Sequence, residues 1–270
     1  MQRQMFRVLF YTVVIGYAFM TLVPFIWSIY TSLKAMPDID KLWVPLGNLT
    51  IENYTYIVDK FPFIQWLLNS VFVAGVVTLG NLFFNTLAGY ALARIRFPGR
   101  SLLFYVILGV MMVPGQVVMI PVYIMLADWG WINTYWGFTI PFLTSSFGIF
   151  LMRQFFLALP KELEEAATID GLTRWGIFWR IALPLSKPAL AAQTIFMFLG
   201  NWNSFMWPSL LASSDDMFTL PVGLNSFHWQ YTAYWNLDLA GTMYMTIPMI
   251  IVFLIFQKWF IKGIATTGIK

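Results

Sequence analysis

Residues 153–188 read RQFFLALPKELEEAATIDGLTRWGIFWRIALPLSKP and separate two long apolar stretches of the chain. Pro160 suits the first position of a helix, because that position needs no backbone N–H. Glutamates follow it in the first turns, where they interact favourably with the helix dipole. Gly171 suits the left-handed residue that ends a helix. The pattern predicts a helix of about 8–10 residues, which is too short to be stable alone in water.

A second short helix is expected in the other half of this stretch. Thr173 is a suitable N-cap, and Leu183-Pro184 is expected to end the helix. Its apolar side chains are Trp175, Ile177, Phe178 and Ile181. Two interpretations remain open from these residues alone. The stretch is either a docking element for a partner protein or an amphipathic loop that lies on the bilayer.

The composition of the whole chain favours a membrane protein. Of its 270 residues, 59% are hydrophobic and 10% are charged, and the mean hydropathy is +0.71. Soluble domains carry about 25% charged residues. The chain has no cysteine and one histidine, His228. Disulfides and thiolate metal sites are therefore excluded, and zinc and non-haem iron sites are not expected.

Stretches of about 20 mostly apolar residues are long enough to cross a bilayer as helices. The predicted spans are about 8–30, 66–93, 101–126, 132–152, 189–211 and 239–257, and none contains Asp, Glu, Lys or Arg. The first apolar run is longer than the core of a signal peptide, and no A-x-A cleavage pattern follows it. We therefore expect a single all-α membrane domain over residues 1–270, with six transmembrane helices.

The distribution of basic residues predicts the orientation of these spans, because Lys and Arg stay on the cytoplasmic side. Of the 16 basic residues, 13 fall on one side of a six-span arrangement. They are Arg3, Arg7, Arg94, Arg96, Arg100, Arg153, Lys161, Arg174, Arg180, Lys187, Lys258, Lys262 and Lys270. Lys34, Lys41 and Lys60 are left outside. Both termini and the 153–188 loop are thus predicted to be cytoplasmic, and the net charge of +4 reflects topology rather than nucleic-acid binding.

The loop also carries a recognisable pattern. Glu165-Ala166-Ala167 is followed after three residues by Gly171, and nine residues later by Ile181-x-Leu183-Pro184. This spacing resembles the signature of permease subunits of bacterial ATP-binding-cassette importers. The likeness extends over essentially the whole chain and is greatest to the carbohydrate-uptake branch, of the maltose and glycerol-phosphate permease type. It implies the type I importer permease fold and a place in the bacterial cytoplasmic membrane.

The resemblance also implies partners for the chain. They are a homologous second permease that completes the pore, a dimer of ATPase subunits and an extracytoplasmic solute-binding protein. The residues implied to couple the permease to an ATPase are Glu165, Ala166, Ala167, Asp170, Gly171, Leu183 and Pro184. The chain has no G-x-x-x-x-G-K-[ST] phosphate loop. We therefore expect it to be no enzyme and to hold no cofactor, with ATP and magnesium used by the partner ATPase.

Polar side chains inside the predicted spans are candidates for a solute path, because such groups often face a cavity. The candidates are Asn69, Asn81 and Asn85 in the second span, Gln116 in the third, and Asn201 and Asn203 in the fifth, the last pair surrounded by Trp202, Phe205 and Trp207. Amides that bond hydroxyls and aromatic faces that cover sugar rings suit a carbohydrate. Hydrogen bonding between helices is the other interpretation, and it remains open for each asparagine.

Other functional classes are less consistent with the sequence. A proton-coupled carrier needs Asp, Glu or His within the membrane, and the predicted spans have none. An intramembrane enzyme lacks a general base at that depth, and a pure scaffold leaves the loop pattern unexplained. A self-sufficient sodium-coupled carrier needs fewer charges and remains the alternative. The favoured hypothesis is a permease that moves a sugar, polyol or oligosaccharide by alternating access.

Overall fold

The computed structural model describes residues 2–230 and 235–267, and it describes side chains for residues 3–225 and 235–261. The described part is helical, and its one extended pairing is a single bridge between Lys34 and Leu49. The α-helices are α1 (Gln2–Ser32), α2 (Glu52–Lys60), α3 (Phe63–Arg94), α4 (Arg100–Met111), α5 (Met119–Asp128), α6 (Tyr135–Thr139), α7 (Ser146–Ala158), α8 (Glu162–Ile169), α9 (Arg174–Ile177), α10 (Leu183–Leu185), α11 (Lys187–Trp202), α12 (Met206–Leu211), α13 (Leu220–Gln230) and α14 (Trp235–Thr267). Short 3-10 turns, at Met36–Asp38, Leu46–Asn48, Ile140–Phe142 and Asp215–Met217, and one π-helical turn, at Phe178–Ala182, complete the order. The side chains of His228, Lys262 and Lys270 lie outside the described residues.

The chain forms two compact units. The first unit comprises Met1–Ile64 with Gly223–Ile247, and the second comprises Gln65–Val222 with Pro248–Lys270. The single domain expected over residues 1–270 stays a prediction, and hydropathy shows which segments are apolar but not which of them pack together.

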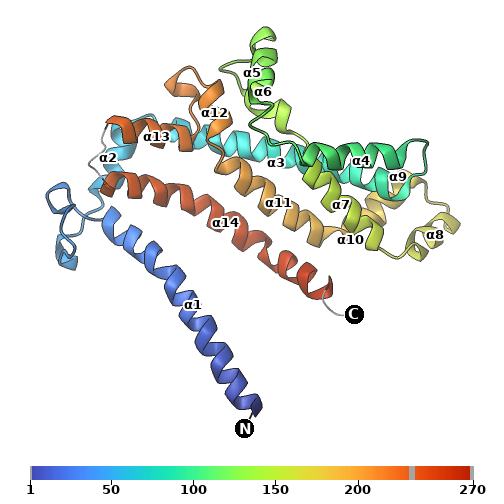
Figure 1. Cartoon of the computed structure of the whole chain (residues 1–270), viewed down its shortest axis with the longest axis horizontal. Helices are drawn as coiled ribbons and strands as arrows, with labels where there is room; N and C mark the ends of the chain where they lie inside the picture. Colours follow the sequence, from blue (N-terminus) through green and yellow to red (C-terminus); the bar gives the residue numbers. More distant parts are fainter. Residues whose placement is uncertain (1, 231–234, 268–270) are drawn as a thin grey trace. The chain divides into compact units, whose positions relative to one another are not determined.

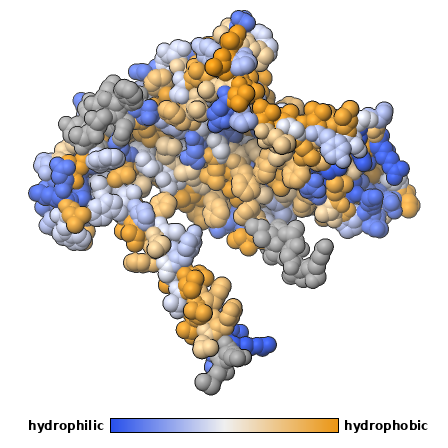
Figure 2. Space-filling model, in the orientation of Figure 1, coloured by the Kyte–Doolittle hydropathy of each residue, from blue (hydrophilic) through white to orange (hydrophobic). Residues whose placement is uncertain are grey.

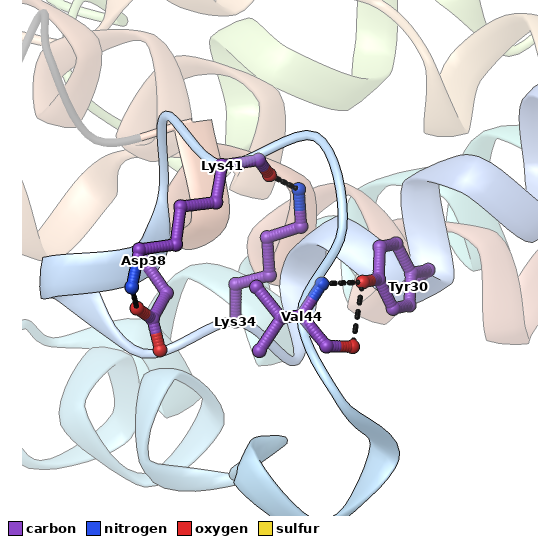
Figure 3. Close-up of polar contacts among 5 residues, drawn as sticks. All are labelled: Tyr30, Lys34, Asp38, Lys41 and Val44. Carbon is purple, nitrogen blue, oxygen red and sulfur yellow. Dashed lines mark hydrogen bonds and ion pairs between the residues drawn. The ribbon is translucent and has the colours of Figure 1, made fainter.

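A buried lysine organises the loop of the first unit, as Figure 3 shows. The ammonium of Lys34 donates to the carbonyl of Lys41 at 2.7 Å and lies 5.0 Å from the ring centroids of both Trp27 and Tyr30. The Tyr30 hydroxyl donates to the carbonyl of Val44 at 2.8 Å. The backbone next to Lys34 is held by Asn53, whose amide donates to the carbonyls of Ser32 and Lys34. These contacts fold the segment after α1 back onto the end of that helix.

Helix α3 forms the centre of the second unit and runs beside α7 and α11 in Figure 1. One apolar cluster joins α3, α7, the π-helical turn and the start of α11 through Tyr90, Ala93, Met152, Phe156, Phe178, Ala182 and Ala189. Another cluster joins α3, α5, α6 and α12 through Val73, Val77, Leu126, Phe138 and Leu211. The side-chain amide of Gln193 on α11 also donates to the carbonyl of Asn81 on α3, at 2.9 Å.

Close approach of the helices depends on glycine at two points of α3. A Cβ atom at Gly89 would lie 2.6 Å from the Cβ of Met152 and 2.9 Å from the backbone nitrogen of Arg153. At Gly80, a Cβ atom would lie 2.5 Å from a methyl group of Leu143. Since real Cβ atoms do not approach other atoms so closely, α3 packs here on the 143–153 segment through its bare backbone.

The helices agree with the predicted spans in part. Four are long and apolar enough to cross a membrane: Arg3–Ser32, Phe63–Arg94, Tyr135–Ala158 and Trp235–Ile261. A fifth candidate is the pair Arg174–Leu185 and Lys187–Trp202, which is bent by 73°. By length and composition the described residues thus supply four or five spans, and the predicted six, with both termini inside, stays a prediction.

Three predicted spans are not continuous α-helices. The span expected at 101–126 consists of α4 and α5, because Pro114 lacks a backbone N–H and disfavours helix at the residue before it. The span expected at 189–211 begins at Lys187, ends at Trp202 and is followed after Ser204 by the short α12. The span expected at 132–152 begins and ends later, at 135–158, and consists of α6, a 3-10 turn at Ile140–Phe142 and α7.

Large apolar side chains cover the outside of several helices. Figure 2 shows hydrophobic surface along α1 and along α4. None of the most apolar window of α1 is buried within the chain, and on α4 Leu102, Tyr105 and Val110 are all more than half exposed. Water does not stabilise such surfaces, so they face lipid or a partner subunit.

The packing at Gly89 leads to a stability prediction. Gly89→Ala forces a methyl group into Met152 and Arg153, which should lower the free energy of unfolding by about 1–3 kcal/mol. Gly75→Ala is the matched control, because Gly75 lies in the same helix and a Cβ atom there would meet nothing within 4 Å. The control should unfold at the same or a slightly higher temperature, since alanine favours helix by about 1 kcal/mol. Thermal unfolding in detergent measures both, and equal midpoints would contradict the close contact between α3 and α7.

Candidate functional site

The predicted docking helix is α8, and it covers residues Glu162–Ile169. Its N-cap is Lys161, so Pro160 lies just before the helix instead of at its first position as expected. The helix ends as the sequence predicts, because Gly171 has a left-handed φ of 83°. The N–H groups of Gly171 and Leu172 donate to the carbonyls of Thr168 and Ala167, which is the Schellman arrangement of a helix end.

The two sides of α8 have different surroundings. Ala167 is buried within the second unit, with 4% of its surface exposed. Ile169 is 86% exposed, Leu163 is 44% exposed, and Ala166 is also exposed. Ala167 faces inward, and its small side chain allows close packing. The other side of α8 presents Leu163, Ala166 and Ile169, which the described part of the chain leaves exposed.

An ion pair fixes the inward side of α8. The Nε of Arg94, at the end of α3, lies 2.9 Å from Oε1 of Glu164, and their side chains are 6% and 19% exposed. The two atoms form an ion pair, but the N–H of Arg94 is not aligned for a hydrogen bond to Glu164. The same guanidinium donates through Nη2 to the carbonyl of Leu159 at 2.6 Å. No sequence pattern points to this pair, because Arg94 and Glu164 are too far apart in the chain for a local pattern to connect them.

The second helix of the loop begins as predicted and ends differently. Thr173 caps it, and its hydroxyl accepts from the backbone N–H of Gly176. Leu183-Pro184 does not end the helix, because the π-helical turn Phe178–Ala182 precedes it and its wider backbone accommodates a residue without an N–H. The break comes at Ser186, where the chain bends by 73° into α11.

Three asparagines of α3 bind backbone of neighbouring segments. Asn81 donates to the carbonyl of Phe142 at 2.7 Å, and the Oδ1 of Asn85 accepts from the hydroxyl of Thr144 at 2.8 Å. The amide of Asn69 donates to the carbonyls of Asp216 and Phe218. Asn69, Asn81 and Asn85 are each at most 1% exposed. All three side chains therefore form hydrogen bonds between α3 and neighbouring segments. Asn81 and Asn85 do not face an open path in this structure.

The candidates near the end of α11 occupy different environments. Trp202 is 1% exposed and stacks on Phe198, with ring centroids 5.6 Å apart. Asn201 is partly buried and lines a cavity of about 170 Å³ together with Ser204 and Trp207. Asn203 and Phe205 are exposed.

The side chain of the exposed Asn203 makes its hydrogen bonds through the amide nitrogen. It donates to the carbonyl of Leu199 at 2.9 Å and approaches the sulfur of Met249 at 3.2 Å. Gln116 is also exposed, in the turn between α4 and α5. Among the described residues, no group of three or more His, Asp or Glu side chains is placed to hold a metal ion.

Comparison with known protein families gives a match over most of the chain. The family described as "Binding-protein-dependent transport system inner membrane component" matches residues 85–266. The arabinooligosaccharide transport system permease protein AraQ of Halalkalibacterium halodurans is 35% identical over 278 residues and is aligned over the full length of both proteins. The sn-glycerol-3-phosphate transport system permease protein UgpE of Yersinia pestis is 38% identical over 208 residues, which is 76% of this chain and 74% of that protein.

Solved structures agree with these relatives. A chain in the crystal structure of a bacterial ABC transporter involved in import of the acidic polysaccharide alginate superimposes with a TM-score of 0.80 and 26% identity. The superposition covers 95% of this chain and 97% of that one. A second alginate transporter structure, in complex with an alginate-bound periplasmic protein, gives a TM-score of 0.66 at 16% identity and supports the fold alone.

The Arg94–Glu164 pair leads to a prediction about the rigidity of α8. Arg94→Ala removes both the ion pair and the bond to Leu159, and an 8-residue helix has little stability of its own. We expect amide hydrogen exchange in α8 to become about 5- to 150-fold faster, as for a loss of about 1–3 kcal/mol. Arg96→Ala, measured in phospholipid-free detergent, is the control, because Arg96 is exposed. Unchanged exchange in the Arg94 variant would show that Ala167 packing alone holds the helix.

Proposed function

The chain belongs to the family of inner-membrane components of binding-protein-dependent transport systems, and from that premise we propose that it imports carbohydrate through a pore driven by a partner ATPase. Because members of this family are multi-pass permeases of ABC importers, the family match favours this function over the alternative of a self-sufficient sodium-coupled carrier. The proposal adds three elements, which are the site of ATPase docking, the class of solute and the composition of the complex.

The outer side of α8 is the proposed docking surface for an ATPase subunit. The observation that carries this proposal is the contrast between its two sides, with Ala167 and Glu164 held by the chain and Leu163, Ala166 and Ile169 exposed. An apolar stripe on a short exposed helix is suited to insertion into a groove of another protein. Glu165 and Ala166 on this helix and Asp170 and Gly171 at its C-terminal end are proposed as coupling residues, with Ala167 supporting the helix from the inward side.

The second half of the loop is proposed to carry motion from the docking surface to the pore. The loop continues from α8 through Thr173 and the π-helical turn to the bend at Ser186, and α11 begins there. Leu183 and Pro184 lie directly before that bend. A push on α8 is proposed to act through these short turns on the helix whose far end carries Asn201 and Asn203. ATP is bound and hydrolysed by the partner, in keeping with the absence of a phosphate loop from this sequence.

The proposed solutes are sugars and related polyols or oligosaccharides. The relatives named above are transport proteins for arabinooligosaccharides and for sn-glycerol-3-phosphate, and a neighbouring structure concerns alginate. The exposed amide of Asn203 and ring of Phe205 offer the hydrogen-bonding and apolar contacts that a sugar requires, with Asn201 and Trp202 as their neighbours on the same chain segment. Asn81 and Asn85 leave the proposed path, because both amides are engaged in packing.

The proposed complex contains a second, homologous permease, an ATPase dimer and an extracytoplasmic binding protein. The uncovered apolar surface of α1 and α4 supports the second permease, since lipid and a homologous subunit are the two environments that such helices suit. The distribution of basic residues supports a bacterial cytoplasmic-membrane topology with both termini and α8 on the inner side.

Ile169→Glu tests the docking surface. The residue is 86% exposed, so its replacement should leave the folded permease intact. A charge placed in an apolar interface should reduce both ATPase co-purification and solute uptake by about tenfold or more. Ile51→Glu is the matched control, because Ile51 is 68% exposed in the loop predicted on the opposite side of the membrane. It should retain the ATPase. Normal ATPase recovery with Ile169→Glu would exclude this side of α8 as the contact.

A pair of asparagine variants tests the solute path. Asn203→Ala should change the relative uptake of arabinooligosaccharides and glycerol phosphate while leaving ATPase co-purification and thermal stability unchanged, because Asn203 is exposed. Asn85→Ala should instead lower stability by about 1–3 kcal/mol, since it leaves Thr144 and the backbone of Ser145 without their partner. If the Asn203 variant has an unaltered uptake profile, Asn203 does not contact the solute and has a structural role only.

A further inference from the structure

A cavity of about 590 Å³ lies beside α8, between that helix, the segment after α3 and the start of α9. Basic side chains dominate its walls. They are Arg94, Arg96, Arg100, Lys161 and Arg174, against Glu164 and Glu165 as the acidic ones. Its size is within the range of about 300–1,000 Å³ that is typical of small-molecule sites.

The charges of this cavity are poorly neutralised by the chain. Arg94 is paired with Glu164, and Arg100 donates to the carbonyl of Ile95 at 3.2 Å without losing its charge. Among the described residues, no hydrogen bond or ion pair engages the charged groups of the remaining basic residues, Arg96, Lys161 and Arg174. With Glu165 as the only other carboxylate in the wall, the cavity carries a formal charge of about +3. Such a cavity attracts an anion.

An apolar groove continues from the basic cavity along α3. It has a volume of about 430 Å³ and is lined by Leu87, Tyr90, Ala91, Ile95, Arg174, Trp175 and Phe178. Tyr90, Ile95 and Arg174 belong to the walls of both hollows, so the groove and the cavity are adjoining. Trp175 is 63% exposed at the groove, and tryptophan is typical of the boundary between membrane and water. The combined hollow is apolar at one end and cationic at the other.

We propose that this combined hollow is a binding site for an anionic phospholipid of the inner leaflet. The phosphate headgroup occupies the cationic cavity between Arg96 and Arg174, and an acyl chain lies in the groove on Leu87 and Ala91. Basic pockets between transmembrane helices on the cytoplasmic side are suited to anionic headgroups. A soluble phosphate would use the cavity but would leave the groove empty, so the adjoining groove favours the lipid. Glu165 borders the cavity and is also a proposed coupling residue, but the exposed Leu163, Ala166 and Ile169 of α8 and the residues of the proposed solute path line neither hollow.

Native mass spectrometry of the full-length chain in detergent tests the proposal. Phosphatidylglycerol is the probe, and phosphatidylcholine is the zwitterionic comparison. We expect phosphatidylglycerol to bind more tightly. Arg174→Gln and Arg96→Gln should each weaken its binding about fivefold, which is the effect of one basic residue near an anionic lipid surface. Arg180→Gln is the matched control. It is an exposed arginine of the same loop that lines neither hollow, and its replacement should leave the affinity unchanged.

A second arm separates the lipid from a soluble anion. Ala91→Phe fills the groove and should weaken phosphatidylglycerol binding, while inorganic phosphate at the same concentration should compete poorly with the lipid. Circular dichroism and thermal unfolding establish that each variant is folded, and Leu87→Trp replaces Ala91→Phe if the latter does not fold. Equal binding of the two lipids, or equal loss in the Arg180 control, would overturn the site. Full competition by inorganic phosphate, with no effect of either groove variant, would overturn the lipid as its ligand.

Discussion

Hydrogen bonds from the asparagines of α3 satisfy the irregular backbone of the second unit, and its architecture depends on them. Non-helical backbone at membrane depth is tolerated only where protein or water satisfies its polar groups. The break around Phe142–Ser145, inside a predicted span, presents such groups, and the segment Asp215–Phe218, outside the predicted spans, presents further irregular backbone beside α3. Asn81 binds the carbonyl of Phe142, Asn85 binds the N–H of Ser145, and Asn69 binds the carbonyls of Asp216 and Phe218. A single straight helix thus supplies the partners that allow its neighbours to be broken.

This arrangement explains how much of the fold could be predicted from the sequence. The C-terminal end of α8 and the start of α9 could be predicted closely, because Gly171 and Thr173 act through contacts within a few residues. The helix breaks near Pro114 and Asn203 could not be predicted in this way. Hydropathy averages over a window of residues and does not show where a helix ends inside that window. The roles of Asn81 and Asn85 were equally inaccessible. Their partners lie about 60 residues away in the chain, and only the fold shows whether a buried amide faces a helix or a cavity.

The basic residues show a similar division between local and long-range information. Counting them predicts a strong inside bias, with Lys34 among the few that are left outside. In the structure, Lys34 is 1% exposed, and its ammonium is held by the carbonyl of Lys41 and by two aromatic rings. Because the Lys34 ammonium has its partners within the first unit, Lys34 supports a loop and carries little information on topology. Without Lys34, the share of basic residues predicted on the inner side is higher than the count of 13 among 16 gives. Arg94 combines both roles, because it belongs to the inside set and also holds Glu164.

The bend at Ser186 gives Leu183-Pro184 a different role from that of a helix stop. Ser186 donates from its backbone N–H to the carbonyls of Ala182 and Leu183, and from its hydroxyl to Leu183 at 2.8 Å, which satisfies the end of one helix. Pro188 then fits the first turn of the next helix, where its missing N–H has no intrahelical partner to lose. Prolines on both sides of a hydrogen-bonded serine fix the place of the bend without making it loose. Because Ala182 and Ala189 pack into the same apolar cluster, the two arms are also held at their inner faces. In the proposed mechanism, a displacement of α8 on ATPase docking would therefore be passed to α11 as a rotation about this bend.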